Sequence, residues 1–248
     1  MQHNKIIEAC QEFLQLPQAE SVTTYLNGRL SKQAQEKFLF GYFPTYNELH
    51  LLIDKVGEDL LAEYHLLYKK FIQDGILNKT EVHSPLEEHN LVLPYRDVYG
   101  NIISMLGRTI LSEDERKEKK IAKYKNTSFQ KGRHLYGLYE AKKDIIKKNY
   151  AIIVEGQFDC ISASDKGLTN VVALGSSNMT WEQLALISRY TTNLKLLLDS
   201  DEAGQEGERR IVEHYGRYAK IEKIKLPGGY KDIDEFLKYN GAEDLGLC

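Results

Sequence analysis

The last hundred residues of the chain alternate between short apolar runs and longer segments with helical spacing. The apolar runs, rich in β-branched residues or leucine, are residues 151–154, 170–174, 194–198 and 221–226. The segments with helical spacing lie between them, at 158–166, 180–189 and 202–218. Strands that alternate with helices in this way are typical of an α/β fold with a parallel, doubly wound sheet. Such a sheet places its functional residues at the carboxyl ends of its strands.

Acidic residues stand just after three of these four runs. They are Glu155 and Asp159 after the first run, Asp199 and Asp201 after the third, and Asp232 and Asp234 after the fourth. At about 4 Å and an effective dielectric near 20, each unpaired carboxylate contact costs on the order of 4 kcal/mol. The cluster therefore requires cations, protons or basic partners. Oxygen ligands of this kind suit Mg²⁺ or Mn²⁺, and two such ions can promote an in-line displacement at phosphorus.

Each acidic motif also has a simpler explanation as a helix N-cap that carries a surface charge. This applies to the Asp-x-Asp at 199–201, and equally to Asp232 and Asp234 before a C-terminal helix. Their joint occurrence, each at the end of its own strand, favours the metal site. Gly156 also favours the metal site, because a side chain there would crowd an approaching phosphate or metal ligand.

The first half of the chain has a different pattern. Residues 1–80 favour amphipathic helices, except that the apolar residues of 49–71 are too dense to distinguish helix from strand. Ser31 is placed to begin a short helix that ends before Gly41. The apolar runs on either side of residues 97–101 predict a β-hairpin.

Farther along, residues 112–120 are almost wholly polar and predict a loop or a helix start, and residues 136–146 predict a helix. With a boundary near residue 149, we expect an α+β subdomain over 1–149 and a catalytic α/β domain over 150–248.

The formal net charge of −3 hides an asymmetry along the chain. Residues 116–148 hold twelve Lys and Arg against three acidic residues, whereas the first ninety residues and those from 149 onward each carry a net charge of −5. A basic segment beside an acidic one suits a polyanionic substrate that is handled with metal ions. The alternative is a solvated, Lys-rich surface.

Other features bear on location and on zinc. The longest apolar stretches are too short to span a bilayer, and acidic and polar residues interrupt the N-terminus, so neither a membrane span nor a secretory signal is expected. We expect a cytoplasmic protein. Its three cysteines are scattered, which fits a reducing compartment and provides no zinc ribbon.

The motifs, taken in order, resemble those of a known family. Val154-Glu155-Gly156 with Asp159, and Leu198-Asp199-Ser200-Asp201, are similar to the signature of the Toprim domain, which bacterial-type primases, topoisomerases and several nucleases share. From Tyr25 to Leu237 the chain looks most like the RNA polymerase core of bacterial (DnaG-type) primases. The other matching stretches are 93–97 with Gly107-Arg108, 123–128, 131–141 and 232–236.

The resemblance implies roles for individual residues. It makes Glu155, Asp199 and Asp201 the catalytic acids and metal ligands, with Asp159, Asp232 and Asp234 as further ligands. It also implies a groove for single-stranded template and nucleotide phosphates, at Arg96, Arg108, Lys123, Tyr124, Asn126 and Lys131. Lys and Arg neutralise phosphates, and an aromatic ring can stack on a base. The structural alternative for Arg96 is an ion pair with Asp97.

The function implied is template-directed synthesis of short RNA primers on single-stranded DNA, from ribonucleoside triphosphates and with Mg²⁺ or Mn²⁺. Ligands for the zinc-binding domain that usually begins such primases are missing, and so is the helicase-binding domain that usually ends them. We therefore expect no zinc, and either a zinc-domain protein or helicase acting in trans, or a minimal primase of phage or mobile-element type.

Two other functions stay open. A Toprim nuclease would use the same metals, but it has no need of the block at 91–141. A non-catalytic factor that binds single-stranded DNA would gain nothing from acids facing phosphates.

Overall fold

The computed structural model describes residues 2–74, 77–127 and 129–247, and the chain divides into two units. Unit 1 consists of residues 1–95 and 101–129, and unit 2 of residues 96–100 and 130–248. The boundary expected near residue 149 falls within unit 2, at the end of a helix. It stays a prediction for the start of the catalytic domain.

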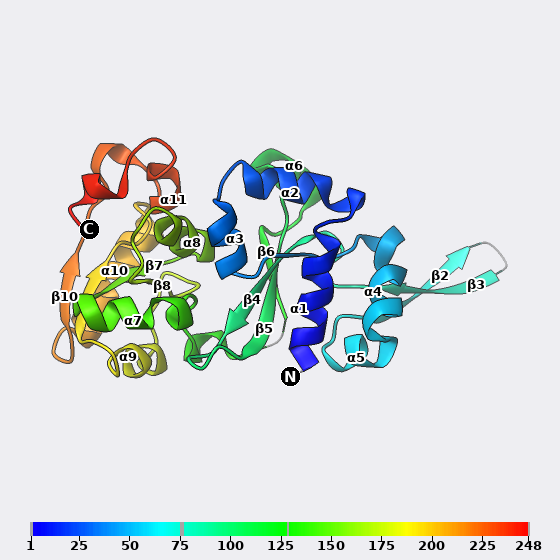
Figure 1. The fold of residues 1–248 in the computed structure, drawn as a ribbon, viewed down its shortest axis with the longest axis horizontal. Helices are drawn as coiled ribbons and strands as arrows, with labels where there is room; N and C mark the ends of the chain where they lie inside the picture. The colour runs from blue at the N-terminus through cyan, green and yellow to red at the C-terminus, as the bar shows by residue number, and fades with distance from the viewer. Residues whose placement is uncertain (1, 75–76, 128, 248) are drawn as a thin grey trace. The chain divides into compact units, whose positions relative to one another are not determined.

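Unit 1 packs helices against a small sheet (Figure 1). Its helices are α1 (Gln2–Phe13), α2 (Glu20–Asn27), α3 (Lys32–Lys37), α4 (Leu49–Val56), α5 (Glu58–Glu63) and α6 (Glu113–Lys119). The sheet has the order β1-β4-β5-β6, formed by β1 (Gly41–Tyr42), β4 (Leu91–Arg96), β5 (Ile102–Arg108) and β6 (Tyr124–Asn126). The predicted pairing of the strands on either side of residues 97–101 is confirmed by the neighbours β4 and β5.

Two helices of unit 1 begin where the sequence provides an N-cap. The Ser31 hydroxyl accepts a hydrogen bond from the Ala34 N–H at the start of α3, as expected. Ser112 and Glu115 form a reciprocal capping box at the start of α6, so the polar stretch 112–120 contains a helix rather than only a loop. Such caps satisfy N–H groups that have no partner inside the helix.

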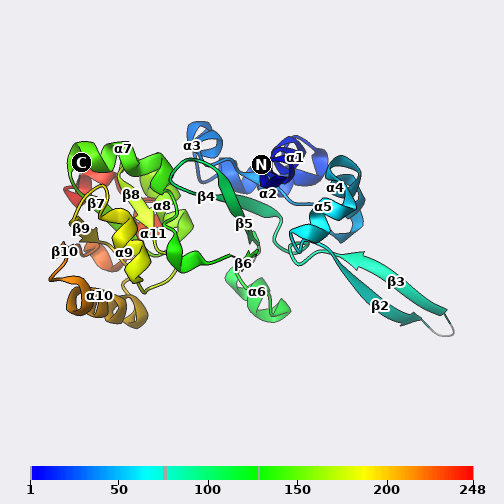
Figure 2. The same ribbon diagram turned by 90° about the horizontal axis from the view of Figure 1, so that it is seen from below.

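One expectation for unit 1 is wrong. Residues 72–80, for which we expected helix, belong in their described part to a two-stranded antiparallel hairpin of β2 (Tyr68–Asp74) and β3 (Leu77–His83). Figure 2 shows this hairpin extending away from α4 and α5. The physical reason is visible in β2, where a short run with aromatic and β-branched residues suits a strand better than a helix.

Unit 2 contains the predicted parallel sheet, in the order β10-β9-β7-β8. Its strands are β7 (Ala151–Val154), β8 (Val171–Ala173), β9 (Asn193–Leu196) and β10 (Lys220–Lys223). The helices are α7 (Leu138–Lys148), α8 (Gln157–Asp165), α9 (Trp181–Ile187), α10 (Glu202–Tyr215) and α11 (Ile233–Phe236). All three strand pairs are parallel, which confirms the expected fold class.

The strand order reverses between β7 and β9. After β7 the chain moves to β8 on one side, and after β9 it moves to β10 on the other. Because crossovers between parallel strands are right-handed, the helices that follow these two strands leave on opposite faces of the sheet. The ends of β7 and β9 therefore form the topological switch point, where α/β sheets hold their ligands.

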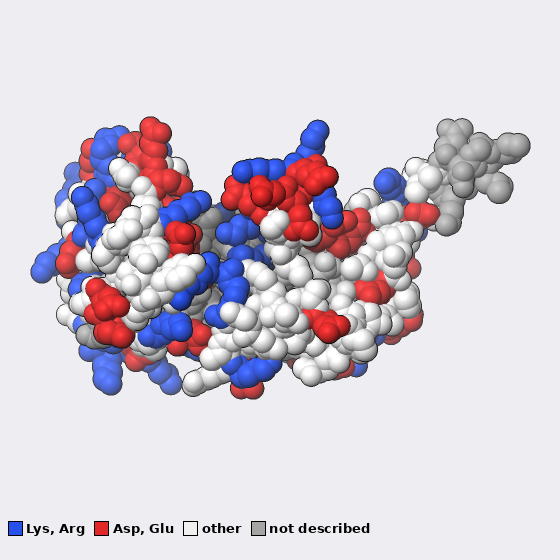
Figure 3. Space-filling model, turned by 90° about the horizontal axis from the view of Figure 1, so that it is seen from above, with Lys and Arg blue, Asp and Glu red and all other residues white. Residues whose placement is uncertain are grey.

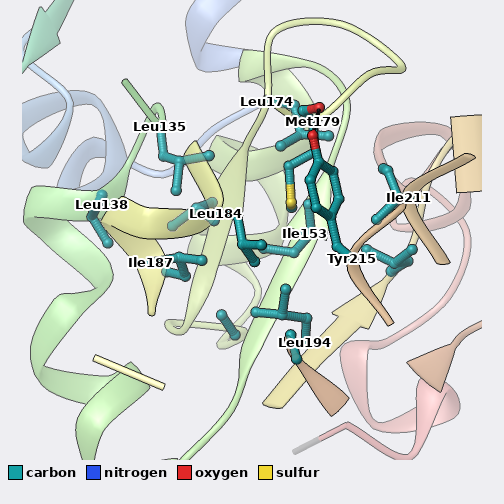
Figure 4. Packing of buried hydrophobic residues seen from close by; sticks show 14 of the residues in the cluster. Leu135, Leu138, Ile153, Leu174, Met179, Leu184, Ile187, Leu194, Ile211 and Tyr215 are labelled. Atoms are coloured by element: carbon teal, nitrogen blue, oxygen red, sulfur yellow. Dashed lines mark hydrogen bonds between the residues drawn. The ribbon is translucent and has the colours of Figure 1, made fainter. Parts of the chain in front are cut away.

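The core of unit 2 lies under α7, α9 and α10 (Figure 4). Ile153 from the central strand, Leu184 from α9 and Ile211 from α10 meet there, and all three are buried. This packing fixes the strands whose ends carry the acidic residues. No helix in the described part of the chain combines the length and apolar character needed to cross a membrane.

Candidate functional site

Glu155 and Asp199 lie side by side at the switch point of unit 2. Glu155 follows β7 directly, and its Oε1 accepts a hydrogen bond from the Asp199 N–H at 3.1 Å. Burial raises the pKa of the Glu155 carboxyl to about 7, and the charges of Asp199 and Asp201 add to the rise. Glu155 is therefore able to hold or release a proton near neutral pH.

Asp201 directly precedes α10, and its carboxylate accepts a hydrogen bond from the first turn of this helix. Its Oδ1 accepts from the Gly204 N–H at 3.0 Å, so Asp201 is the N-cap of α10. A Cβ on Gly204 would lie 2.0 Å from the Asp199 carbonyl oxygen and 2.8 Å from Glu155 Oε1. Only glycine lets the first turn of α10 approach these two strand ends so closely.

Asp159 lies in the first turn of α8, where its Oδ2 accepts from the Gly156 N–H at 2.9 Å. Burial raises the pKa of the Asp159 carboxyl well above its usual range, and the charges of Asp232 and Asp199 raise it further. A Cβ on Gly156 would lie 2.5 Å from Asp159 Oδ2. The glycine after Glu155 is thus explained by the aspartate beneath it.

The third acidic pair belongs to α11. Asp232 is the N-cap of this helix and accepts from the Glu235 N–H at 2.7 Å. Asp234 Oδ1 accepts from the Ser162 hydroxyl of α8 at 2.6 Å, and its Oδ2 lies 3.6 Å from Lys238 Nζ. These bonds join α11 to α8 and bring its charges within range of Asp159.

Asp201 and Asp232 thus serve as helix N-caps and also carry negative charge. Among the described residues, no group of three or more His, Cys, Asp or Glu side chains is already arranged to hold a metal ion. The donor set nevertheless fits a hard divalent cation, because every candidate ligand is a carboxylate. A double positive charge beside Glu155 would relieve the repulsion that helps to raise the pKa of its carboxyl.

An open pocket of about 1210 Å³ borders Asp199 and Asp201. It lies between the first half of α10 and the end of β10, and Arg209, Lys223 and Lys225 also line it. This volume is at least as large as usual ligand pockets, and its walls carry both signs of charge.

Two of the predicted basic residues belong to unit 2. Lys131 Nζ donates to the Gly175 carbonyl at 2.7 Å, and the Gly175 N–H donates to the Glu155 carbonyl at 2.8 Å. Lys131 therefore lies at the same edge of the sheet as Glu155. Arg96 forms an ion pair with Glu140 and lies over the Tyr139 ring. The Asp97 carboxylate accepts from the Tyr99 N–H within the turn.

The remaining predicted contacts belong to unit 1. Arg108 at the end of β5 faces Tyr124 of β6 directly across the strand pair, and donates to its hydroxyl at 2.6 Å. Lys123 and Asn126 are exposed nearby. The same Arg108 also donates to the hydroxyl of Tyr25 on α2, at 2.6 Å.

Tyr25 and Arg29 were not among the predicted site residues. Arg29 donates to the Tyr25 hydroxyl at 2.7 Å and lies over its ring. Arg29 lies two residues beyond the end of α2 (Glu20–Asn27), so the i and i+4 spacing within a helix does not account for this contact.

Some lysines of the basic segment have partners close to them in the structure. On the face shown in Figure 3, Lys and Arg side chains lie among Asp and Glu side chains. Lys117 Nζ lies 2.6 Å from Glu113 on α6, and Lys142 donates to the Val98 carbonyl. Part of the basic segment is thus an ordinary charged surface, as the alternative held.

Comparison with known proteins gives the family. Residues 10–142 match the family described as the N-terminal domain of the DNA primase catalytic core, and residues 152–237 match the Toprim-like family. The first match covers more than half of the chain. The chain belongs to the DNA primase catalytic core family.

Individual relatives of the chain are DNA primases, in agreement with this family. The chain is similar to the DNA primase of Aquifex aeolicus, with 33% identity over 228 residues that cover 89% of this chain and 43% of the relative. It is also similar to the DNA primase of Synechococcus elongatus, with 29% identity over 94% of this chain and 34% of that relative. The chain thus spans less than half the length of these relatives.

Solved structures confirm the fold. A DnaG catalytic core superimposes with a TM-score of 0.79 at 26% identity, over 99% of this chain and 78% of that one. A DnaG primase catalytic domain bound to single-stranded DNA gives a TM-score of 0.77 at 25% identity, over 99% of this chain and 80% of that one.

Proposed function

We propose that this chain synthesises short RNA primers on a single-stranded DNA template by metal-dependent nucleotidyl transfer. The observation that carries the proposal is the Glu155–Asp199 pair at the switch point, with further carboxylates on α8, α10 and α11. Unit 1 adds cations and aromatic rings of the kind that single-stranded nucleic acid requires.

In this proposal Glu155, Asp199 and Asp201 hold Mg²⁺ or Mn²⁺, and Asp159, Asp232 and Asp234 add ligands or negative charge. The bound ions would neutralise phosphate charge and stabilise the leaving oxygen of an in-line displacement. Glu155 would also assist the transfer of the proton from the attacking 3′-hydroxyl.

Lys131 and the arginines would interact with negatively charged groups. Lys131, whose Nζ donates to the Gly175 carbonyl beside the strand end of Glu155, would bind a nucleotide phosphate. Arg108, Lys123, Tyr124 and Asn126 would contact the template. Arg96, which forms an ion pair with Glu140, would also contact nucleic acid or nucleotide. Ribonucleoside triphosphates are the proposed substrates, and a helicase or a zinc-domain protein the proposed partners in trans.

The test is incubation with single-stranded DNA, labelled ribonucleotides and Mg²⁺ or Mn²⁺. We expect short labelled oligoribonucleotides that are lost in Asp199→Ala. The matched control is Glu222→Ala, which removes an exposed carboxylate of β10 in the same unit and should leave the products unchanged.

Two other outcomes of this experiment would replace the proposed function with another. Shortening of the input DNA without new RNA would replace primase with nuclease. Template binding with neither product, unchanged by Asp199→Ala, would leave a non-catalytic binding factor.

A further inference from the structure

Two tyrosines that flank α11 in the sequence lie with their rings beside each other. Tyr230 precedes this helix and Tyr239 follows it, and their ring centroids are 6.2 Å apart with 21° between the ring planes. Tyr239 is 74% exposed, whereas Tyr230 is only partly exposed. The Tyr239 ring is therefore accessible to a ligand. We call these two residues the tyrosine pair.

A buried ring of α11 supports the tyrosine pair. Phe236 is 1% exposed, and its ring meets the Tyr230 ring edge-on, with 5.4 Å between the centroids and 87° between the planes. The Tyr239 N–H donates to the Phe236 carbonyl at 3.1 Å, in the turn that ends α11. A single exposed aromatic side chain is common on protein surfaces, but an exposed ring supported by a second ring and by a buried third forms a platform.

The backbone at Tyr230 is bonded to the loop that carries Asp199 and Asp201. Ser200 lies between these two aspartates in the sequence, and its hydroxyl donates to the Tyr230 carbonyl at 2.9 Å. The Ser200 N–H donates to the Lys231 carbonyl at 2.7 Å. These two hydrogen bonds fix the segment before α11 against the acidic loop.

The helix between the two tyrosines is short enough to keep both rings near the acidic residues. It has four residues, which correspond to a length of about 6 Å. Its N-cap is Asp232, one of the proposed metal ligands, so Tyr239 beyond its other end stays close to that carboxylate. Burial raises the pKa of the Glu155 carboxyl to about 7, and the positive charge of Lys231 opposes this rise. Lys231 beside the tyrosine pair is therefore within electrostatic range of Glu155.

An accessible aromatic ring beside a proposed site for phosphates suits the base of a nucleotide. Every nucleobase has a flat π face, and its stacking on an aromatic ring strengthens binding by roughly tenfold or more. The base and the phosphates of a nucleotide are joined through one sugar, so a base on the platform would keep its phosphates near the metal ligands. Lys231 is exposed and adds a positive charge there, which suits the phosphates.

We propose that the tyrosine pair binds a nucleobase, with Tyr239 as the stacking surface and Tyr230 as the residue that positions it. Because an aromatic ring stacks on every base, the pair would accept all four. The base belongs either to a free ribonucleotide or to the 3′ end of the primer strand. This inference rests on the proposed function for its ligand, and it adds Tyr230 and Tyr239 to the residues of the site.

The first experiment uses isothermal titration calorimetry with Mg²⁺ to compare ATP with inorganic tripolyphosphate, which has phosphates but no base. Tyr239→Ala should weaken ATP binding roughly tenfold, because it removes the ring on which the base stacks, and should leave tripolyphosphate binding unchanged. Tyr239→Phe keeps the ring and should bind ATP as the unchanged chain does. Tyr230→Ala should weaken ATP binding several-fold without affecting tripolyphosphate, and Tyr230→Phe should restore it.

The second experiment separates the two sources of the base. The same variants are titrated against a fluorescent DNA template with and without an annealed RNA primer, and binding is followed by anisotropy. A loss confined to ATP assigns the pair to the free ribonucleotide, and a loss confined to the primed template assigns it to the primer end. The matched control is Tyr99→Ala, which removes a tyrosine of unit 2 that is 79% exposed and should change neither affinity.

The outcomes distinguish the inference from the function on which it rests. Unchanged affinity for both ATP and primed template in Tyr239→Ala would overturn the inference, even if the unchanged chain makes primers. Equal losses of ATP and tripolyphosphate binding, or no rescue by Tyr239→Phe, would overturn stacking as the cause. Unchanged binding in Tyr230→Ala would overturn its positioning role.

Thermal unfolding of every variant comes first. Because Tyr239 is mostly exposed, its variants should unfold as the unchanged chain does, and they carry the test if Tyr230→Ala does not fold. If the unchanged chain makes no primers but Tyr239→Ala still lowers its affinity for ATP and not for tripolyphosphate, the proposed function alone fails.

Discussion

Glu155 should destabilise unit 2 at high pH when no metal is present. Its pKa is raised from 4.5 to about 7 in the folded chain, first by burial and then by its acidic neighbours. For a carboxyl whose folded pKa lies above the unfolded one, the stabilising contribution is complete below the unfolded pKa. It is lost as pH rises through the folded pKa, here between about 4.5 and 7.

The size of the effect follows from the shift in pKa. At about 1.4 kcal/mol for each unit of pKa, the full rise would correspond to about 3.4 kcal/mol. Because the carboxyl is partly open to solvent, which screens its charge, we expect roughly 1–2 kcal/mol. Glu155→Gln keeps an oxygen that can accept from the Asp199 N–H and removes the ionisation. The variant should therefore exceed the unchanged chain in stability by this amount at pH 8, and match it near pH 5.

The measurement is urea unfolding in the presence of a chelator, followed by tryptophan fluorescence. Trp181 is the single tryptophan of the chain and packs against Tyr215 and Tyr218 in unit 2, so its signal reports on the relevant unit. Adding Mg²⁺ at pH 8 should stabilise the unchanged chain more than the variant, and Glu222→Gln should behave as the unchanged chain. A stability gap that is the same at pH 5 and pH 8 would refute the reasoning.

Three further predictions concern packing and ion pairing. Ile145→Ala should lower the unfolding free energy by about 3 kcal/mol, whereas Ile146→Ala should change it by less than about 0.5 kcal/mol. These neighbours on α7 are 0% and 59% exposed, and equal losses in urea unfolding would contradict the helix register. Arg96→Ala leaves the buried Glu140 carboxylate without its ion-pair partner and should cost about 2–3 kcal/mol in the same assay, unless a second mutation, Glu140→Gln, removes that charge. Gly204→Ala forces the first turn of α10 away from the Asp199 carbonyl and should abolish primer synthesis, while Gly28→Ala, whose Cβ would meet nothing closer than 3.4 Å, should retain it.

The fold of unit 2 could be predicted because its signals are local. Each strand is a short apolar run, each helix has its own period, and the acids follow the runs directly, so the order of elements was right throughout residues 151–223. β7 coincides with its predicted run, and the other three strands differ from theirs by one to three residues at their ends. The order of strands in the sheet depends on pairing between distant segments, which no local pattern contains.

The β2–β3 hairpin of unit 1 shows where local signals were overlooked. Asp74 pairs with Leu77, so the two strands are only two residues apart in the sequence, and a glycine directly after the first run is a hairpin signal. The strong helical pattern at the N-terminus led us to extend the helical prediction too far. Residues 75–76 themselves lie outside the described residues.

The candidate site was predicted by residue type but not by contact. That Asp201 and Asp232 both cap helices was foreseen as an alternative to metal binding, and the structure shows the caps. Nothing local indicated that Arg108 would be buried between rings 83 and 16 residues away in the chain. Such a contact arises only when α2 packs beside the end of the sheet, which periodicity does not contain.

Because Asp201 and Asp232 cap helices, the fold should tolerate their replacement by asparagine. Asparagine caps a helix about as well as aspartate, because either side chain offers an oxygen to the N–H groups of the first turn. Exchanging a single oxygen for an amide nitrogen at either position would thus remove a negative charge while the helix still begins at the same residue. If these carboxylates bind metal as proposed, a lineage could lose the metal site by such a step and keep a fully folded protein.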